Sequence, residues 1–329
     1  MRIVFAGTPG ISVPTLEACL EAGHDVALVI TQPDRPSGRG RRVLPSPVKA
    51  FAVERGLAVF QPAGINAPET LALVRQVEPD AMVVSAFGQK LSPELLASPR
   101  WGCFNVHASL LPKYRGSAPI NWAILNGEEE SGVTVIRMNE RMDAGEILAR
   151  KAVRIEEDWT AGDLGEALSR VGATLMVRTL AELEAGTARA IPQDPSKVSR
   201  APMLRKEDGL IDWTKCARRV RNHVRGMTPW PGAFTFLADD RTARHLRLTV
   251  LRSVVAEDAG KEVSSPSSRA PDPSSGTVLG VGRRGIAVSC GEGALVLVEV
   301  KPAGSRAMSA DDFARGHRLA PGMRFTDHE

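Results

Sequence analysis

The chain has 329 residues, of which 43% are hydrophobic and 24% are charged, and its formal net charge is +4. This length predicts two domains, and the absence of any apolar run near 20 residues excludes an ordinary transmembrane helix. Cysteines occur only at Cys19, Cys103, Cys216 and Cys290, a spacing that excludes a Cys-x-x-Cys zinc site and favours reduced thiols.

The amino-terminal residues predict the start of a parallel α/β sheet. Arg2 to Ala6 is an apolar strand that leaves no room for a signal peptide, so we expect a cytoplasmic protein. A Gly-Thr-Pro-Gly turn and hydrophobic residues at helical spacing follow. This order begins a Rossmann-like unit, but the turn lacks the full Gly-x-Gly-x-x-Gly pattern. A nicotinamide dehydrogenase is therefore only an alternative interpretation.

Residues 32–49 have an unusual charge pattern, because they hold several prolines and glycines and only one acid, Asp34. Few apolar side chains are present, which predicts an exposed, mobile loop. Arginines without compensating acids also fit an arm that contacts phosphates and becomes ordered on binding. Both interpretations stay open at this point. The basic residues of the segment are Arg35, Arg39, Arg41, Arg42 and Lys49.

Helices and strands then alternate along the chain. We predict helices over 47–55, 66–77 and 118–125 and strands over 57–60 and 81–85, with Asn66 and Glu69 as an N-terminal cap. The loop Phe87-Gly88-Gln89 follows the strand 81–85. In a doubly wound sheet, ligands bind outside the carboxyl ends of the strands, so this loop is expected to border the site. Alternatively, Phe87 belongs to the hydrophobic core.

The stretch that begins at Cys103 carries the residues best suited to catalysis. Asn105 and His107 alternate with two hydrophobic residues, so both polar side chains leave the same face of a predicted strand. The loop Ser109 to Pro112 follows at once, and its proline stiffens it. Cys103 shares that face and is either a nucleophile or, more simply, a buried small hydrophobe.

A third polar partner is expected from the turn that contains Asp143, between predicted strands at 133–136 and 147–155. From this turn Asp143 can reach His107 and orient its ring. An amide, an imidazole and a carboxylate suit acyl or formyl transfer, because charge builds on a carbonyl oxygen while an attacking amine loses a proton.

At these residues the sequence resembles the 10-formyltetrahydrofolate-dependent formyltransferases. The likeness rests on Asn105-Val-His107, Ser109-Leu-Leu-Pro112 and Asp143. It implies that Asn105, His107 and Asp143 are catalytic and that no metal or tightly bound cofactor is needed. It also implies that 10-formyltetrahydrofolate, the co-substrate, is bound by Ser109, Leu110, Leu111, Pro112, Phe87, Gly88 and Gln89.

Further motifs resemble the members of that family that formylate methionyl initiator tRNA for translation initiation. They lie at residues 5–9, 32–36, 38–40, 45–49, 230–231, 302–304 and 307–310, so the likeness spans nearly the whole chain. It implies an enzyme that binds tRNA through the basic segment, with Arg35, Arg39, Arg41, Arg42 and Lys49. A second basic group, Lys215, Arg218, Arg219 and Arg225, follows on a predicted helix and either binds tRNA phosphates as well or forms a solvated helical face. We expect a monomer. Formyltransferases acting on sugar nucleotides or glycinamide ribotide share the Asn-His-Asp set and remain alternatives, as does a catalytically silent RNA-binding protein.

The second half predicts a change of architecture. Thr160 with Asp163 starts a long amphipathic helix that ends at Gly186 and closes a catalytic domain over 1–189. A linker over 190–207 leads to a second domain over 208–329, where a basic helix that includes Lys215 precedes strands at 234–237, 246–255, 277–282, 286–289 and 295–300. Residues 257–275 have the composition of a disordered insertion.

The fold class expected from these elements is α/β. The first domain is a Rossmann-like doubly wound, mostly parallel sheet, and the second is a small β-barrel of the oligonucleotide-binding type.

Overall fold

The computed structural model describes residues 1–37, 42–239, 244–256 and 275–327, and the insertion expected over 257–275 lies almost wholly outside them. Two compact units are present. The first contains Met1–Pro119, Glu130–Arg154 and Leu164–Met203, and the second contains Ile120–Glu129, Ile155–Asp163 and Leu204–Glu329. None of the helices in the described part combines the length and apolarity that spanning a bilayer requires.

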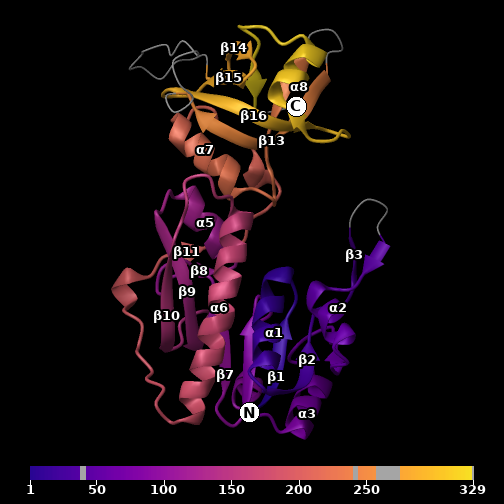
Figure 1. Cartoon of the computed structure of the whole chain (residues 1–329), viewed down its shortest axis with the longest axis vertical. Helices are drawn as coiled ribbons and strands as arrows, with labels where there is room; N and C mark the ends of the chain where they lie inside the picture. The colour runs from indigo at the N-terminus through magenta and orange to yellow at the C-terminus, as the bar shows by residue number, and fades with distance from the viewer. Residues whose placement is uncertain (38–41, 240–243, 257–274, 328–329) are drawn as a thin grey trace. The chain divides into compact units, whose positions relative to one another are not determined.

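A twisted sheet organises the first unit (Figure 1). Its strands in spatial order are β10 (Ile147–Arg154), β9 (Glu130–Arg137), β7 (Cys103–His107), β6 (Ala81–Ser85), β1 (Arg2–Gly7), β2 (Asp25–Ile30) and β5 (Val59–Phe60). The strands from β7 to β5 pair in parallel, whereas β9 is antiparallel to both β7 and β10. The prediction of a mostly parallel, Rossmann-like sheet is therefore confirmed.

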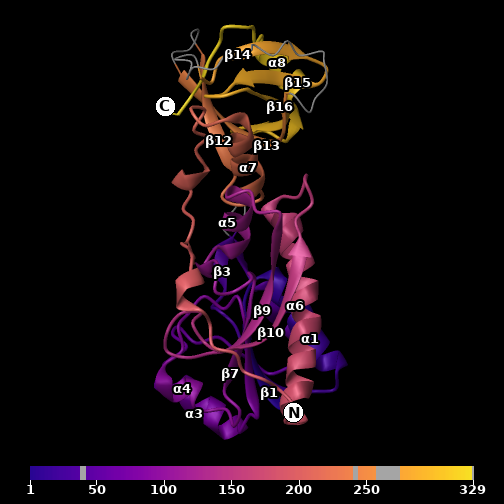
Figure 2. The same cartoon turned by 90° about the vertical axis from the view of Figure 1, so that its left-hand side faces the viewer.

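Helices cover both faces of this sheet. They are α1 (Val13–Glu21), α2 (Pro47–Glu54), α3 (Pro68–Val77), α4 (Pro93–Leu96) and α6 (Ala161–Glu184). Figure 2 shows α1 and α6 on one side of the sheet and α3 and α4 on the other. Burial on both faces explains why the central strands are almost uniformly apolar, as parallel sheets require.

The alternation of side chains along β7 decides where the polar residues of this strand point. Gly172 of α6 packs so closely on Val106 that an added Cβ would lie 2.7 Å from its Cγ1. Cys103, on the opposite face, belongs to the hydrophobic cluster that includes Leu91 and Leu95 beside α4. Asn105 therefore leaves the face away from α6, because successive side chains of a strand alternate.

The basic segment differs from its prediction. Instead of an irregular loop, its described part forms a short antiparallel pair, β3 (Arg35–Ser37) and β4 (Arg42–Leu44), around residues 38–41, which lie outside the described part. Val43 and Leu44 are exposed. A two-stranded ribbon satisfies part of its own backbone hydrogen bonding, which a composition argument does not detect.

Two predicted helix caps had different outcomes. Thr160 and Asp163 form the reciprocal hydrogen bonds of a capping box before α6, as predicted. Asn66 does not cap α3, which begins after Ala67, so that prediction was wrong. The Asn66 side chain instead donates to Lys90 O and accepts from Ser92 N.

The second unit is built on an antiparallel sheet. Its strands in order are β14 (Val278–Gly282), β15 (Gly285–Ser289), β16 (Ala294–Pro302), β13 (Arg244–Val255), β12 (Ala233–Asp239) and β18 (Phe325–Thr326), with β17 (Met308–Ser309) on β16. This curled sheet is consistent with the predicted small barrel. Its helices are α5 (Pro119–Leu125), which starts in the first unit, α7 (Ala217–Gly226) and α8 (Ala310–His317).

Sequence reasoning missed the end of this unit, because no element was predicted after residue 300. Helix α8 is capped by Ser309, whose hydroxyl accepts from Asp312 N, and Phe313 is fully buried. Trp213 stacks on Phe325 and donates its indole N–H to Thr235. These contacts join residues far apart in sequence and complete the core.

Candidate active site

The carboxyl ends of neighbouring parallel strands bring the predicted residues to one edge of the first sheet. Val84 of β6 lies opposite Asn105 of β7, and His107 is the last residue of β7. The loop that starts after Ser85 therefore leaves the sheet beside the strand that carries the polar pair. This is the edge at which doubly wound folds bind their ligands.

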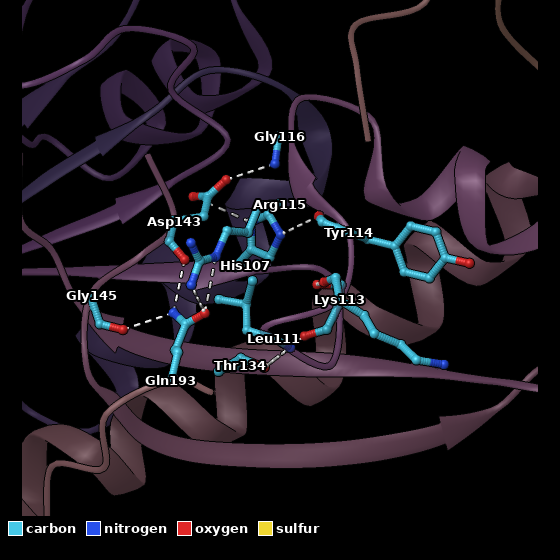
Figure 3. A network of polar contacts seen from close by, with 11 residues as sticks. His107, Leu111, Lys113, Tyr114, Arg115, Gly116, Thr134, Asp143, Gly145 and Gln193 are labelled. Atoms are coloured by element: carbon cyan, nitrogen blue, oxygen red, sulfur yellow. Dashed lines mark hydrogen bonds and ion pairs between the residues drawn. The ribbon is translucent and has the colours of Figure 1, made fainter. Parts of the chain in front are cut away.

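His107 and Asp143 meet at this edge, as the sequence predicted (Figure 3). The His107 side chain is 6% exposed and the Asp143 side chain 13%, and His107 Nδ1 lies 3.6 Å from Asp143 Oδ1. The other carboxylate oxygen accepts from Gly116 N at 2.9 Å. Asp143 has φ +51°, a left-handed conformation that aspartate adopts more readily than most residues other than glycine.

The partner of the second ring nitrogen of His107, Nε2, shows which nitrogen of the ring carries a hydrogen. Nε2 lies 3.0 Å from the carbonyl oxygen of Tyr114, which can only accept, so Nε2 donates. A ring with this single hydrogen presents a bare Nδ1 to the carboxylate of Asp143. Nδ1 can donate to Asp143 only when the ring holds both hydrogens, which gives the pair an imidazolium and carboxylate form.

Asn105 differs from His107 and Asp143 in the hydrogen bonding of its side chain. Its side chain is half-buried, and it makes no hydrogen bond with any of the described residues. An amide N–H at the ligand-binding edge is suited to stabilising a developing oxyanion. The Asn105 amide and the His107 ring thus lie at the end of β7, and the Asp143 carboxylate reaches His107 from a turn beside it.

The loop after β7 is held by Thr134 rather than by the proline alone. The Thr134 hydroxyl is fully buried, donates to Ser109 O at 2.7 Å and accepts from Leu111 N at 3.1 Å. The Ser109 hydroxyl donates to Lys113 O. Ser109, Leu111 and Pro112 are buried and Leu110 is half-buried, so much of this loop packs inside the unit. Its predicted folate contacts stay a prediction.

Thr134→Val is expected to lower the free energy of unfolding by about 2 to 4 kcal/mol, because it leaves a buried carbonyl and a buried N–H without a partner at unchanged volume. Denaturant titration measures this. Thr174→Val, at an exposed threonine of α6, is the matched control and changes the value by less than about 0.5 kcal/mol. Equal stabilities for the two variants would show that Thr134 does not hold the loop.

The predicted folate loop after β6 is divided between core and surface. Phe87 is buried in the hydrophobic cluster between β6 and α3, so the alternative placement in the core is the observed one. Gly88 is exposed at φ +84°, a conformation that favours glycine. Gln89 accepts from Ile65 N through its side chain. The exposed backbone around Gly88 is the part of this loop that a ligand can reach.

The basic residues of the segment 32–49, which we call the arm, have different environments. Arg35 is exposed, Arg42 lies in β4, and Arg39 and Arg41 lie outside the described residues. Lys49 pairs with Asp34 at 2.5 Å, and Gln61 donates to the other oxygen of this carboxylate. These bonds lower the pKa of Asp34, Lys49 first and Gln61 second. Lys49 thus fixes the base of the arm.

The basic helix of the second unit also separates into two groups. Arg218 and Arg219 are exposed and form no ion pair with a described residue, whereas Lys215 precedes the helix and pairs with Asp212. Arg225 is half-buried and donates to Glu157 O and Trp159 O. Burial, and after it repulsion from a neighbouring arginine, lowers the pKa of Arg225.

Two further polar side chains of the site were missed by sequence reasoning. Arg115 donates from Nε and Nη2 to Gln193 Oε1, and Gln193 Nε2 donates to Asp143 O and Gly145 O (Figure 3). Burial lowers the pKa of Arg115, and the charge of Asp143 opposes this effect. Gln193 lies in the predicted linker, 50 residues from Asp143, and no local pattern indicates this contact.

Cys103 is a structural residue. It is 1% exposed, and burial raises the pKa of its thiol to about 12, which leaves no thiolate for nucleophilic attack near neutral pH. Among the described residues, no group of His, Cys, Asp and Glu side chains is arranged to hold a metal ion.

Comparison with known proteins places these features in context. Residues 1–180 match the model of the formyl transferase family, and residues 203–318 match the model of the formyl transferase C-terminal domain. The chain is 44% identical to the methionyl-tRNA formyltransferase of Geobacter metallireducens, over 98% of both proteins. It is 46% identical to that of Heliobacterium modesticaldum, over 99% of this chain and 100% of the relative.

Solved structures share the fold at lower identity. A sugar 3N-formyl transferase, WlaRD, crystallised with dTDP and 5-N-formyl-THF, has a TM-score of 0.62 and 17% identity over 93% of this chain and 99% of its own. An N-formyltransferase from Helicobacter canadensis, in complex with folinic acid and dTDP-3-aminofucose, has a TM-score of 0.61 and 18% identity over 90% and 98%. These likenesses support the architecture alone.

Proposed function

The chain belongs to the formyl transferase family, and from this premise we propose that it transfers a formyl group from 10-formyltetrahydrofolate to the α-amino group of methionine on initiator tRNA. The product is N-formylmethionyl-tRNA, which starts translation. The observation that carries this proposal is the 44% identity to a methionyl-tRNA formyltransferase over 98% of both chains. Both units, and not only the catalytic one, therefore match.

The reaction forms one C–N bond and breaks another. The neutral α-amino group of methionine attacks the formyl carbon, and the carbonyl oxygen becomes negatively charged in a tetrahedral intermediate. The bond between this carbon and N10 then breaks, and tetrahydrofolate leaves. One proton passes from the attacking nitrogen to N10, so the site must stabilise an oxyanion and move a proton.

Asn105 supplies the oxyanion donor in this proposal. Its amide has no hydrogen-bond partner among the described residues and leaves β7 at the ligand-binding edge. A donor that is fixed before the reaction needs no reorganisation when charge develops, which makes it effective. The backbone of β7, paired on both sides, holds this donor in place.

His107 and Asp143 divide the proton transfers. His107 Nε2 donates to the intermediate and delivers a proton toward N10, and Asp143 assists removal of the amine proton directly or through water. In the structure, Nε2–H is donated to Tyr114 O, so delivery to N10 requires that this bond be exchanged. Catalytic hydrogen bonds often take their productive partners only when substrates bind.

The second part of the proposal names the residues that bind tRNA. The arm residues Arg35, Arg39, Arg41 and Arg42, and the exposed Arg218 and Arg219 of α7, contact tRNA phosphates. The sequence also assigns Lys49, Lys215 and Arg225 to tRNA binding, but each is already bonded inside its own unit. We expect these three to contribute less to tRNA affinity.

Arg42→Ala is expected to weaken binding of methionyl-tRNA and to reduce the slope of log affinity against log salt by about one unit, because one phosphate contact is lost. Titrations at several salt concentrations measure both quantities. Arg170→Ala, at an exposed arginine of α6 paired with Glu166, is the matched control and leaves the slope unchanged. Identical slopes for the two variants would remove Arg42 from the tRNA interface.

The choice of acceptor is the decisive test of function. One donor, 10-formyltetrahydrofolate, is offered with three amines: methionyl initiator tRNA, an amino-sugar nucleotide and glycinamide ribotide. We expect formylation of the charged tRNA only. Formylation of either small amine in preference to the tRNA would assign the chain to another branch of the family. Binding of tRNA with no transfer to any amine would support the silent RNA-binding alternative.

Three further assignments complete the proposal. The enzyme acts in the cytoplasm, where initiator tRNA is charged, and it acts as a monomer, which light scattering at working concentration checks. Its catalytic domain spans 1–189, a linker spans 190–207, and the tRNA-binding domain spans 208–329.

A further inference from the structure

Gln193 uses every hydrogen-bonding position of its side-chain amide. Nε2 donates to Asp143 O and to Gly145 O, both at 2.8 Å, and Oε1 accepts from Arg115 Nε at 3.1 Å and Nη2 at 2.7 Å. An amide with two donors and two acceptor positions filled has one orientation, because turning it over would break all four bonds. Arg115 therefore fixes which end of the Gln193 amide faces the turn.

The two carbonyls that Gln193 binds belong to the turn that presents Asp143. On the other side this turn packs against the backbone of Arg137, which leaves no space for a Cβ on Gly145. Asp143 itself is held at φ +51°. A left-handed residue other than glycine has a cost in backbone free energy, which contacts from its neighbours offset. Gln193 supplies two of the bonds that do so.

The segment that carries Gln193 is itself anchored to the catalytic unit. Ile191 exchanges two backbone hydrogen bonds with Ile147 at the start of β10. Farther along, β11 (Arg200–Ala201) pairs with β8 (Arg115–Gly116), and the Ser199 hydroxyl accepts from Tyr114 N. The segment thus contacts the turn of Asp143 and the backbone that binds His107 and the Asp143 carboxylate.

We propose that Gln193 is a positioning residue for formyl transfer, which orients the Asp143 carboxylate toward His107, and that Arg115 orients Gln193. This inference rests on the proposed function. Among the described residues, no hydrogen bond joins Gln193 to His107, so Gln193 acts on the reaction through the turn. Displacement of a reacting group by about 1 Å can reduce turnover by about 10²-fold, so loss of these bonds affects kcat.

The test uses the full chain. Gln193→Glu keeps the shape and the acceptor toward Arg115 but replaces both donated hydrogen bonds with repulsion between oxygens. We expect kcat for formylation to fall by about 10-fold to 10²-fold, with little change in either KM. Gln76→Ala, at an exposed glutamine of α3, is the control and leaves kcat unchanged. A full kcat in Gln193→Glu would overturn the proposal.

A double-mutant cycle separates positioning from a general effect on the fold. If Gln193 acts through Asp143, Gln193→Glu lowers kcat far less in an Asp143→Asn background than in the parent. Equal losses in both backgrounds would contradict the inference. Should Gln193→Glu not fold, Gln193→Met, of similar length and without charge, is used in the same cycle. Absence of formylation by the parent enzyme would instead count against the proposed function.

Discussion

Asp143→Asn is expected to reduce the turnover number of formyl transfer by about 10²-fold to 10⁴-fold, the usual contribution of a positioned acid–base group. Asparagine has the same shape and its oxygen can still accept from Gly116 N, so the turn is preserved. The side-chain NH₂, however, donates to His107 Nδ1 and stabilises the ring with a single hydrogen on Nε2. The imidazolium and carboxylate pair can no longer form, and the carboxylate that assists removal of the amine proton is gone.

The measurement is single-turnover formylation of methionyl-tRNA with saturating donor. Asp25→Asn removes an exposed carboxylate of β2 and is the control for the loss of a negative charge. The two variants are compared at equal folded fraction, established by thermal unfolding. A turnover number for Asp143→Asn that equals the control would mean that the pair of His107 and Asp143 has no part in the reaction.

Asn105→Ala is expected to lower turnover by about 10²-fold to 10³-fold, the measured range for removal of one oxyanion donor. Because the Asn105 amide makes no bond with a described residue, its truncation removes little that stabilises the fold. Binding of 10-formyltetrahydrofolate in its ground state should change much less than turnover, since the donor interacts most strongly with the charge of the intermediate.

Asn105→Asp sharpens this prediction. Aspartate keeps the shape of the side chain but donates no hydrogen, and it places a negative charge where the oxyanion forms. Its turnover should therefore be at or below that of Asn105→Ala. Turnover restored toward the parent value in Asn105→Asp would show that Asn105 orients substrate through its oxygen and does not donate to an oxyanion.

The part of the site that sequence reasoning found is the part set by short-range rules. The alternation of side chains along a strand placed Asn105 and His107 on one face, and the end of a parallel strand placed them at the ligand-binding edge. The turn chemistry around Asp143 made its approach to His107 plausible, and the structure brings the two together. Roles in catalysis remain predictions for the variants above.

The parts that were missed depend on contacts between distant residues. Gln193 contacts the backbone of Asp143, so neither its spacing nor its neighbours in the sequence indicate a role. Lys49 and Arg225 carry the charge expected of tRNA ligands, but partners elsewhere in the chain occupy them. Asn66 has the side chain of a good helix cap, but it forms its hydrogen bonds with the backbone of Lys90 and Ser92 instead.

The central claim is that this edge of the sheet moves a one-carbon unit onto an amine. In the most direct test, the chain is incubated with methionyl initiator tRNA and 10-formyltetrahydrofolate that carries carbon-13 in its formyl group. The ester is then cleaved, and the mass of the released amino acid is measured by mass spectrometry. We predict N-formylmethionine that carries the label, formed by the parent chain and nearly absent when Asn105 or Asp143 is replaced. Unmodified methionine from the parent chain, with both substrates intact, would contradict the account.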